Sequence, residues 1–180
     1  MPFIVEEDKS LGDVKIVTSV CFEDERGWFA EVFRLSDFTE MGLFSEIDQI
    51  NHSFSASRGT LRGLHYQESP EEQGKFVCCL KGEIFDVAVD IREGSKTFGK
   101  WTGHLLNPKN RKSLWIPPGF AHGFQTTCND VEVIYLTTGE YSPKHDRSIR
   151  WNDSDIGVNW PIKDAILSDK DVSAPYLREI

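Results

Sequence analysis

Short runs rich in β-branched and aromatic residues, separated by turn sequences, follow one another at nearly regular intervals along the chain. The runs cover residues 14–20, 28–34, 47–54, 60–67, 75–80, 84–91, 99–106, 114–116, 123–127 and 131–138. Turn signals such as Lys81-Gly82-Glu83 and Asn107-Pro108 separate them. Strands this short and this regularly spaced are typical of an antiparallel sandwich or barrel, and we predict an all-β jelly roll.

Helical signals are few and lie outside these runs. Ser36 is predicted to cap a brief helical segment that ends at Gly42. Ser168, with an acid three residues later, has the spacing of a capping box and predicts a helical turn that Pro175 ends. The turn at residues 24–27 leads us to expect that the two runs flanking it pair as a hairpin.

The size and charge of the chain exclude several classes of protein. A length of 180 residues fits one domain over residues 1–180. The net charge of -9 argues against nucleic-acid and membrane-surface binding, because both require a positive field. No signal-peptide pattern opens the sequence and no run approaches the roughly 18 apolar residues of a membrane span, so we expect a cytoplasmic protein.

The cysteines fit a reduced compartment. Cys21, Cys78, Cys79 and Cys128 form no C-x-x-C pair. Adjacent residues of a strand face opposite sides, which places Cys78 and Cys79 on different faces of the predicted strand. We therefore expect ordinary free thiols.

Arg62 and His65 lie three residues apart in a predicted strand that Gly59 and Gly63 interrupt. Glycine inside a strand marks a bulge or a close approach of a ligand or another backbone. The two side chains are therefore candidates for substrate contact. On these residues alone, a barrel strand with a hydrogen-bonded structural histidine explains the pattern as well.

His122 is a second candidate histidine, and it ends the sequence Pro117-Pro118-Gly119-Phe120-Ala121-His122. This stretch resembles P-x-G-x-x-H, the second signature of the cupin jelly roll. The first signature of metal-binding cupins supplies H-x-H, whereas the corresponding stretch here is His65-Tyr66-Gln67. Zinc and iron sites normally need at least three good protein ligands. The resemblance therefore implies a metal-free cupin with short peripheral helical segments.

Further sequence blocks, in the same order along the chain, make the resemblance specific. They are Asp24-Glu25-Arg26-Gly27, Asn51-His52-Ser53, Leu61-Arg62-Gly63-Leu64-His65, Gln73-Gly74-Lys75, Gly82-Glu83-Ile84-Phe85-Asp86-Val87-Ala88-Val89-Asp90, Trp115-Ile116-Pro117, Gly119-Phe120-Ala121-His122-Gly123-Phe124 and Trp151-Asn152-Asp153. Together they resemble the dTDP-4-dehydrorhamnose 3,5-epimerase family over about residues 12–175. The resemblance implies a dTDP-linked 4-keto-6-deoxy sugar inverted at C3 and C5, without metal or nucleotide cofactor.

The resemblance also implies roles for particular residues. Removing a proton from a carbon beside a ketone requires a base, a donor to the ketone oxygen and an acid on the opposite face. The family pattern assigns these roles to His65, Lys75 and Tyr135. It makes Asp171 the partner that orients the histidine. Without the resemblance, Asp171 only completes the capping box with Ser168, and both roles are compatible because a carboxylate has two oxygens.

Residues implied in substrate binding are spread over the whole chain. Arg26 and Arg62 suit a diphosphate, because a guanidinium fork matches paired phosphate oxygens, although exposed arginines often contact only water. The other matching positions are Glu31, Gln49, Asn51, His122, Tyr141, Asp146 and Lys170. In this family the first hairpin crosses to a neighbouring subunit, so the resemblance implies a homodimer in which Arg26 and Glu31 serve the partner's site.

Three positions depart from the commonest pattern of the family, namely Ile50, Leu136 and Asp146. They leave the exact nucleotide and sugar open. Three alternatives stand beside the double epimerase. One is a 3-epimerase or 5-epimerase of another nucleotide-linked 4-keto-deoxysugar. The others are a sugar-nucleotide-binding cupin without catalysis and a metal-dependent cupin enzyme.

Overall fold

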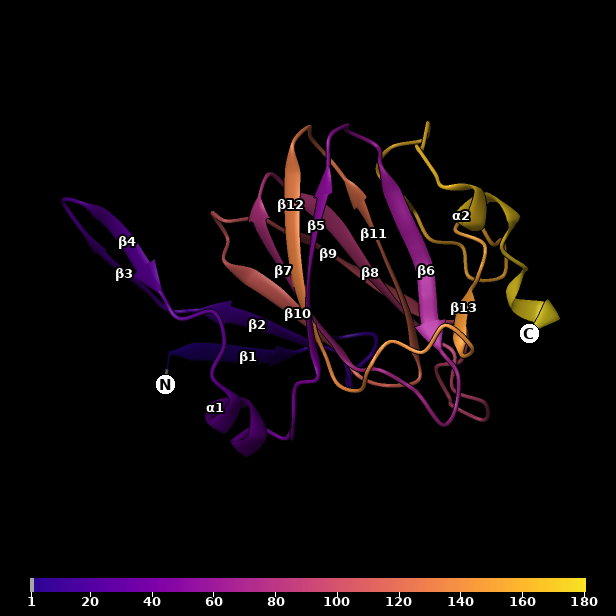
Figure 1. Cartoon of the computed structure of the whole chain (residues 1–180), viewed down its shortest axis with the longest axis horizontal. Coiled ribbons are helices and arrows are strands. Elements are labelled where there is room, and N and C mark those ends of the chain that lie inside the picture. The colour runs from indigo at the N-terminus through magenta and orange to yellow at the C-terminus, as the bar shows by residue number, and fades with distance from the viewer. Residues whose placement is uncertain (1) are drawn as a thin grey trace.

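The computed structural model describes residues 2–180, and two packed antiparallel sheets form its body (Figure 1). The six-stranded sheet has the order β1 (Phe3–Glu7), β2 (Lys15–Ser19), β10 (Lys112–Ile116), β7 (Lys75–Lys81), β12 (Val131–Thr137) and β5 (Gln49–Ser55). The five-stranded sheet has the order β13 (Asp146–Ser148), β6 (Leu61–Gln67), β11 (Phe120–Thr126), β8 (Ile84–Asp90) and β9 (Trp101–Leu106). The all-β prediction is confirmed.

The main core lies between the two sheets. Val77 and Ile116 of the six-stranded sheet belong to the same buried cluster as Ala88 and Phe124 of the five-stranded sheet. Each strand alternates its side chains between two faces, so every second residue enters this core. Full burial of a large apolar side chain contributes roughly 1.5–3 kcal/mol, and this cluster is what holds the sheets together.

The five-stranded sheet is covered on its outer face as well. Val87 and Val89 point away from the main core and pack with Ile149 and Leu177 of the C-terminal region. Both faces of β8 are therefore buried, which explains why its sequence is apolar almost throughout instead of alternating.

Short helices flank the sheets. Phe38 of α1 (Leu35–Glu40) packs edge-on against Phe76 of β7, with ring centroids 4.9 Å apart, and covers the outer face of the six-stranded sheet. α2 (Asp169–Ser173) and the 3-10 helix η1 (Leu177–Glu179) follow in the C-terminal region. Within residues 2–180, none of the helices has the length and apolar character needed to cross a membrane.

The predicted pairing of the first hairpin is wrong. The turn at residues 24–27 does join two strands, but they are β3 (Cys21–Asp24) and β4 (Gly27–Ala30), which form a separate two-stranded arm. β2 instead pairs with β1 and β10. Burial decides between the two arrangements, because Ile16 and Val17 of β2 are buried in the body whereas most of the arm is exposed.

The prediction that Ser36 caps the first helix is also wrong. α1 begins after an extended Arg34 and has no side-chain cap, and Ser36 lies in its first turn. The predicted end is confirmed by Gly42, which follows the C-cap with a φ of +72°. At the other end of the chain, Ser168 caps α2 as predicted, and the helix stops at Ser173, before Pro175.

Four short elements were not predicted: β1, β3, β13 and η1. β1 lies at the edge of its sheet and buries only Phe3, so its sequence carries little periodicity. β13 has three residues and is defined by pairing with β6. The predicted opposite placement of Cys78 and Cys79 is confirmed, because they belong to core clusters on different faces of the six-stranded sheet.

Candidate active site

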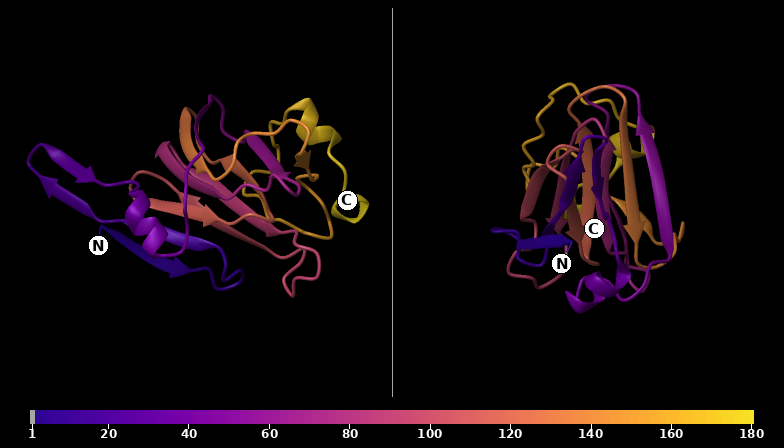
Figure 2. Two further views of the ribbon diagram at one scale, coloured as in Figure 1. Left: turned by 60° about the horizontal axis from the view of Figure 1, so that its bottom comes forward. Right: turned by 90° about the vertical axis from the view of Figure 1, so that its left-hand side faces the viewer.

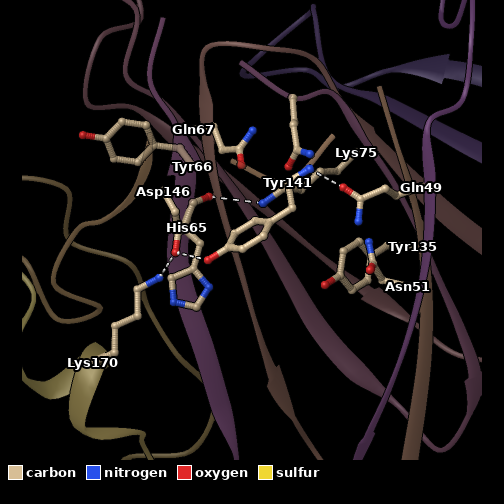
Figure 3. A pocket seen from close by; sticks show the side chains of 11 residues that line it. Gln49, Asn51, His65, Tyr66, Gln67, Lys75, Tyr135, Tyr141, Asp146 and Lys170 are labelled. Carbon is tan, nitrogen blue, oxygen red and sulfur yellow. Dashed lines mark hydrogen bonds and ion pairs between the residues drawn. The ribbon is translucent and has the colours of Figure 1, made fainter. Parts of the chain in front are cut away.

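A cavity of about 330 Å³ lies between the sheets, where the C-terminal ends of β6 and β12 meet the N-terminal ends of β5 and β7 (Figure 3). It is lined by Gln49, Asn51, His65, Tyr66, Gln67, Gln73, Lys75, Tyr135, Tyr141, Asp146 and Lys170. Most of these side chains are polar or charged, although the core directly beneath the cavity is apolar. This cavity is the candidate site.

His65 of β6 is paired with a carboxylate from the far end of the sequence. Its Nε2 lies 2.5 Å from Oδ1 of Asp171, which is only 2% exposed. An ionised carboxylate can only accept a hydrogen bond, so Nε2 carries the proton and Nδ1 keeps its lone pair in the neutral imidazole. The pair thus orients a histidine that can accept a proton at Nδ1.

Asp171 fulfils both roles considered for it. Its Oδ2 accepts a hydrogen bond of 2.7 Å from the hydroxyl of Ser168, and its backbone N–H donates to the same hydroxyl to cap α2. Burial favours a raised pKa for the Asp171 carboxyl, but the hydrogen bonds from His65 and Ser168 outweigh burial and lower this pKa below its usual value. The carboxylate is therefore ionised at neutral pH.

Lys75 enters the cavity from the first residue of β7, and its Nζ lies 3.4 Å from the carbonyl oxygen of His65. Burial lowers the pKa of Lys75 to about 8, while the negative charges of Asp146 and Asp86 oppose the shift and Lys170 adds to it. At neutral pH the ammonium form still predominates. A cation with little solvent around it stabilises a nearby negative oxygen more strongly than it would in water.

Tyr135 lies on β12, in the sheet opposite to the one that carries His65, so the two side chains occupy facing walls of the cavity (Figure 3). Burial raises the pKa of Tyr135, and the positive charge of Arg62 partly opposes this. The phenol is thus protonated at neutral pH and can donate.

These groups are suited to proton transfer at carbon. A proton acceptor lies on one wall, a proton donor lies on the other, and an ammonium group can hold an oxyanion in the same cavity. That combination allows a carbon beside a carbonyl group to lose a proton from one face and regain one on the other.

Three further predicted residues form a cluster in the wall of the cavity. Oδ2 of Asp146 lies 2.5 Å from Nζ of Lys170 and 3.1 Å from the hydroxyl of Tyr141 (Figure 3). Lys170 belongs to α2, next to Asp171, so the same short helix supplies both a cavity-lining cation and the partner of His65. Gln49 and Asn51 line the cavity from β5.

Arg62 and His122 are not among the residues that line this cavity. Arg62 reaches toward β5, where its guanidinium group donates to the hydroxyl of Ser55 and the carbonyl of Phe54. His122 lies directly opposite His65 in the pairing of β6 with β11, and its Nε2 lies 2.7 Å from Oδ1 of the fully buried Asp86. A second histidine–carboxylate pair therefore sits beside the first.

Arg26 and Glu31 lie far from the cavity, on and just after the β3–β4 arm (Figures 1 and 2). The guanidinium group of Arg26 is bonded to Asp24 of the same arm, and Glu31 pairs with Arg34. Neither side chain contributes to the site of its own chain.

The sequence analysis did not single out three polar residues that line the cavity, namely Tyr66, Gln67 and Gln73. Gln67 follows His65 by two residues in one strand, and this spacing places both on the same face of β6. That rule alone was sufficient to find it. Gln73 lies in a connecting segment outside the named strands, so periodicity could not assign it to the cavity.

Comparison with known proteins agrees with this geometry. The family model described as dTDP-4-dehydrorhamnose 3,5-epimerase matches residues 8–179. A dTDP-4-dehydrorhamnose 3,5-epimerase of Shigella flexneri is 49% identical over 162 residues, which are 89% of this chain and 89% of that protein.

Solved structures are similar over nearly the whole length. A dTDP-6-deoxy-D-glucose-3,5-epimerase of Legionella pneumophila, in complex with dTDP-4-keto-L-rhamnose, is 40% identical with a TM-score of 0.94, covering 99% of this chain and 94% of that one. A 3'-monoepimerase of Streptomyces bikiniensis, in complex with dTDP-quinovose, is 32% identical with a TM-score of 0.90. The match covers 96% of this chain and 88% of that one. With its sequence, fold and cavity in agreement, the chain belongs to the dTDP-4-dehydrorhamnose 3,5-epimerase family of isomerases.

Proposed function

We propose that the protein converts dTDP-4-dehydro-6-deoxy-D-glucose to dTDP-4-dehydro-L-rhamnose by inverting C3 and C5, without a metal or a nucleotide cofactor. The observation that carries the proposal is the placement of a carboxylate-paired His65 and a protonated Tyr135 on facing walls of one cavity. A reaction that removes and returns a proton on opposite faces of a carbon needs these two groups in that arrangement.

Each inversion uses the same sequence of proton transfers. Nδ1 of His65 takes the proton from the carbon beside the C4 ketone, and the electron pair of the broken C–H bond moves to the ketone oxygen. The ammonium group of Lys75 holds the resulting enolate. Tyr135 then delivers a proton to the opposite face of that carbon. Solvent exchange returns the imidazolium and the tyrosinate to their starting states.

Asp171 acts through His65. Its ionised carboxylate holds the imidazole in the tautomer with a free Nδ1 and stabilises the imidazolium once the proton has moved. Around the reacting sugar, the polar groups of Gln49, Asn51 and Lys170 line the cavity and are available to the rest of the ligand. Arg62 is assigned to the diphosphate, which requires its guanidinium group to leave the acceptors on β5.

The direct test is turnover in deuterated water. The purified protein is incubated with dTDP-4-keto-6-deoxyglucose, and NMR counts the deuterium at C3 and C5. Double inversion requires label at both carbons, because every returned proton comes from a group that exchanges with solvent. Absence of label at both carbons contradicts catalysis and leaves a binding protein.

Single inversion is the second candidate, favoured by the similarity to the 3'-monoepimerase of Streptomyces bikiniensis. A monoepimerase and a double epimerase can use the same base and the same acid, and they differ in how the sugar ring turns between the two groups. Deuterium at only one carbon in the experiment above establishes this alternative.

The functional unit in this proposal is a homodimer. Arg26 and Glu31 lie on or beside an arm that extends away from its own body, and Phe22, Trp28 and Phe29 of this arm are 58–69% exposed. Exposed apolar side chains grouped in this way mark a protein interface. We assign the arm to the neighbouring subunit, where Arg26 and Glu31 complete the partner's substrate site.

A further inference from the structure

The segment 139–142 follows β12 and carries Tyr141 into the cavity without belonging to a strand or helix. Side chains from other parts of the chain hold its backbone. The N–H of Gly139 donates to Asp48 over 2.6 Å, and its carbonyl accepts from the side-chain amide of Gln73 over 2.8 Å. The N–H of Tyr141 donates to the side-chain oxygen of Gln49.

Gln67 makes the most direct contribution to this support. Its Nε2 donates to the carbonyl of Glu140 over 3.1 Å, and its Oε1 accepts from the N–H of Ser142 over 2.7 Å. The two contacts lie on either side of Tyr141. A third hydrogen bond of 2.6 Å, from the same Nε2 to the carbonyl of Glu71, fixes the amide itself.

The side chain of Gln67 is therefore fully engaged and nearly buried, with 6% exposure, whereas Tyr141 is 55% exposed at the cavity. A buried amide with both ends bonded fixes the backbone that it contacts, because losing either bond leaves a buried polar group unpaired. The position of the Tyr141 phenol ring therefore depends on a backbone that these hydrogen bonds hold in place.

We propose that Gln67 is a positioning residue for substrate binding, which holds Tyr141 in place by clamping the backbone on both of its sides. The inference rests on the proposed function, because Tyr141 is a substrate-binding residue only within it. Gln67 stands where the metal-binding cupin signature has its second histidine. In this chain, the strand position two residues after His65 thus anchors the substrate-binding segment.

A double-mutant cycle tests the proposal, with dTDP as the probe. Gln67→Met keeps the length of the side chain and removes its hydrogen bonds. We expect the Kd for dTDP and the KM for the sugar nucleotide to rise about 3- to 10-fold, the range expected when one side chain must be ordered on binding. The kcat should change less than KM, because His65 and Tyr135 are untouched.

The variant Tyr141→Ala completes the cycle. If Gln67 acts through Tyr141, Gln67→Met has no further effect on dTDP binding once Tyr141 has been removed. An equal effect in both backgrounds overturns the proposal, and so does an unchanged Kd in either single variant. Turnover by the wild type in the same buffer tests the proposed function separately.

Gln125 provides a matched control. It is a fully buried glutamine on the neighbouring strand β11, and it holds Ile162 through a pair of hydrogen bonds of 2.9 Å. Gln125→Met removes the same kind of amide clamp away from the cavity. It should lower the Tm and leave the Kd for dTDP unchanged, whereas a raised Kd here overturns the specific role of Gln67.

Native-state hydrogen exchange gives an answer that does not depend on any variant folding. The amide of Ser142 in the wild-type protein should be protected, because it donates to a buried acceptor. Exchange of that amide at the rate of an unprotected loop overturns the clamp.

Discussion

At the scale of single residues, the cavity combines titratable groups whose surroundings shift their pKa values in different directions. Asp171 is held ionised by its hydrogen bonds, and Tyr135 is held protonated by burial. Burial brings the pKa of Lys75 to about 8, closer to neutrality than that of a lysine in water. Shifts of this kind in neighbouring titratable groups are what acid–base chemistry at one carbon requires.

His65→Asn tests the assignment of the base. Asparagine fills a similar space and keeps a polar group near Asp171, but it cannot take a proton at neutral pH. We expect solvent exchange into the substrate to fall by about 10²- to 10⁴-fold, the usual contribution of a general base. The Kd for dTDP should stay within about threefold, a change of less than about 1 kcal/mol. Exchange at the wild-type rate would refute the role of His65.

The pKa of Lys75 predicts a pH dependence. Lys75 is protonated below about pH 8 and loses its charge above it, so its stabilisation of the enolate is present at low pH and disappears as the pH rises. We expect kcat/KM to decline above about pH 8. Lys75→Arg keeps a positive charge to much higher pH, and whatever activity it retains should not show that decline. A wild-type profile that stays flat up to pH 10 would contradict the assignment.

At the scale of elements, the site depends on how closely β6 approaches β11. A Cβ atom added to Gly63 would lie 2.5 Å from the Cα of Gly123, and Gly63 has a φ of +134°. The register between the two strands shifts beside this contact, between His122 and Phe124. The glycine expected to mark a bulge or a close approach therefore marks both.

Gly63→Ala should be strongly destabilising. The new methyl group meets backbone that cannot move aside and also requires a φ that alanine disfavours, so we expect a loss of about 3 kcal/mol or more in the free energy of unfolding. Gly27→Ala is the matched control, since Gly27 has a φ of +131° and nothing within 4 Å of its added Cβ. Chemical denaturation of both variants separates backbone strain from the clash. Equal losses would show that the close approach contributes nothing.

At the scale of the whole molecule, the arm separates residues that the proposed reaction needs together. The β3–β4 arm extends from the body in Figure 1 and in the left view of Figure 2. The outer face of the six-stranded sheet exposes Ile50, Phe54 and Leu80. Apolar side chains on both the arm and this face favour association of two copies. In such a dimer, Arg26 of one subunit would reach the site of the other.

Mixing two inactive variants tests this arrangement. In a hybrid dimer of Arg26→Ala and His65→Asn subunits, one site would have both side chains intact and the other would have neither. Random reassortment of equal amounts should restore about a quarter of the wild-type sites. Sites built within single chains would give no recovery. Light scattering on each variant checks that it remains dimeric.

The sequence alone determined the fold class, because strand-length runs and turn residues are local properties. It also determined the cap of α2, which needs only Ser168 and the acid three residues later. The resemblance of its motifs to a known family identified the catalytic candidates without showing where any of them lies in the fold. By contrast, the pairing of β2 and the existence of β13 depend on contacts with distant strands, and local pattern either misassigned or missed them.

Only the tertiary structure decided which residues share the cavity. His65 and Asp171 are 106 residues apart and meet because α2 packs beside β6. The clamp of Gln67 on the Tyr141 segment and the pairing of Asp86 with His122 arise in the same way. The physical reason is the distance along the sequence over which each effect acts. Propensity and periodicity act within a few residues, whereas a buried hydrogen bond between distant segments forms only after the two sheets have closed over the core.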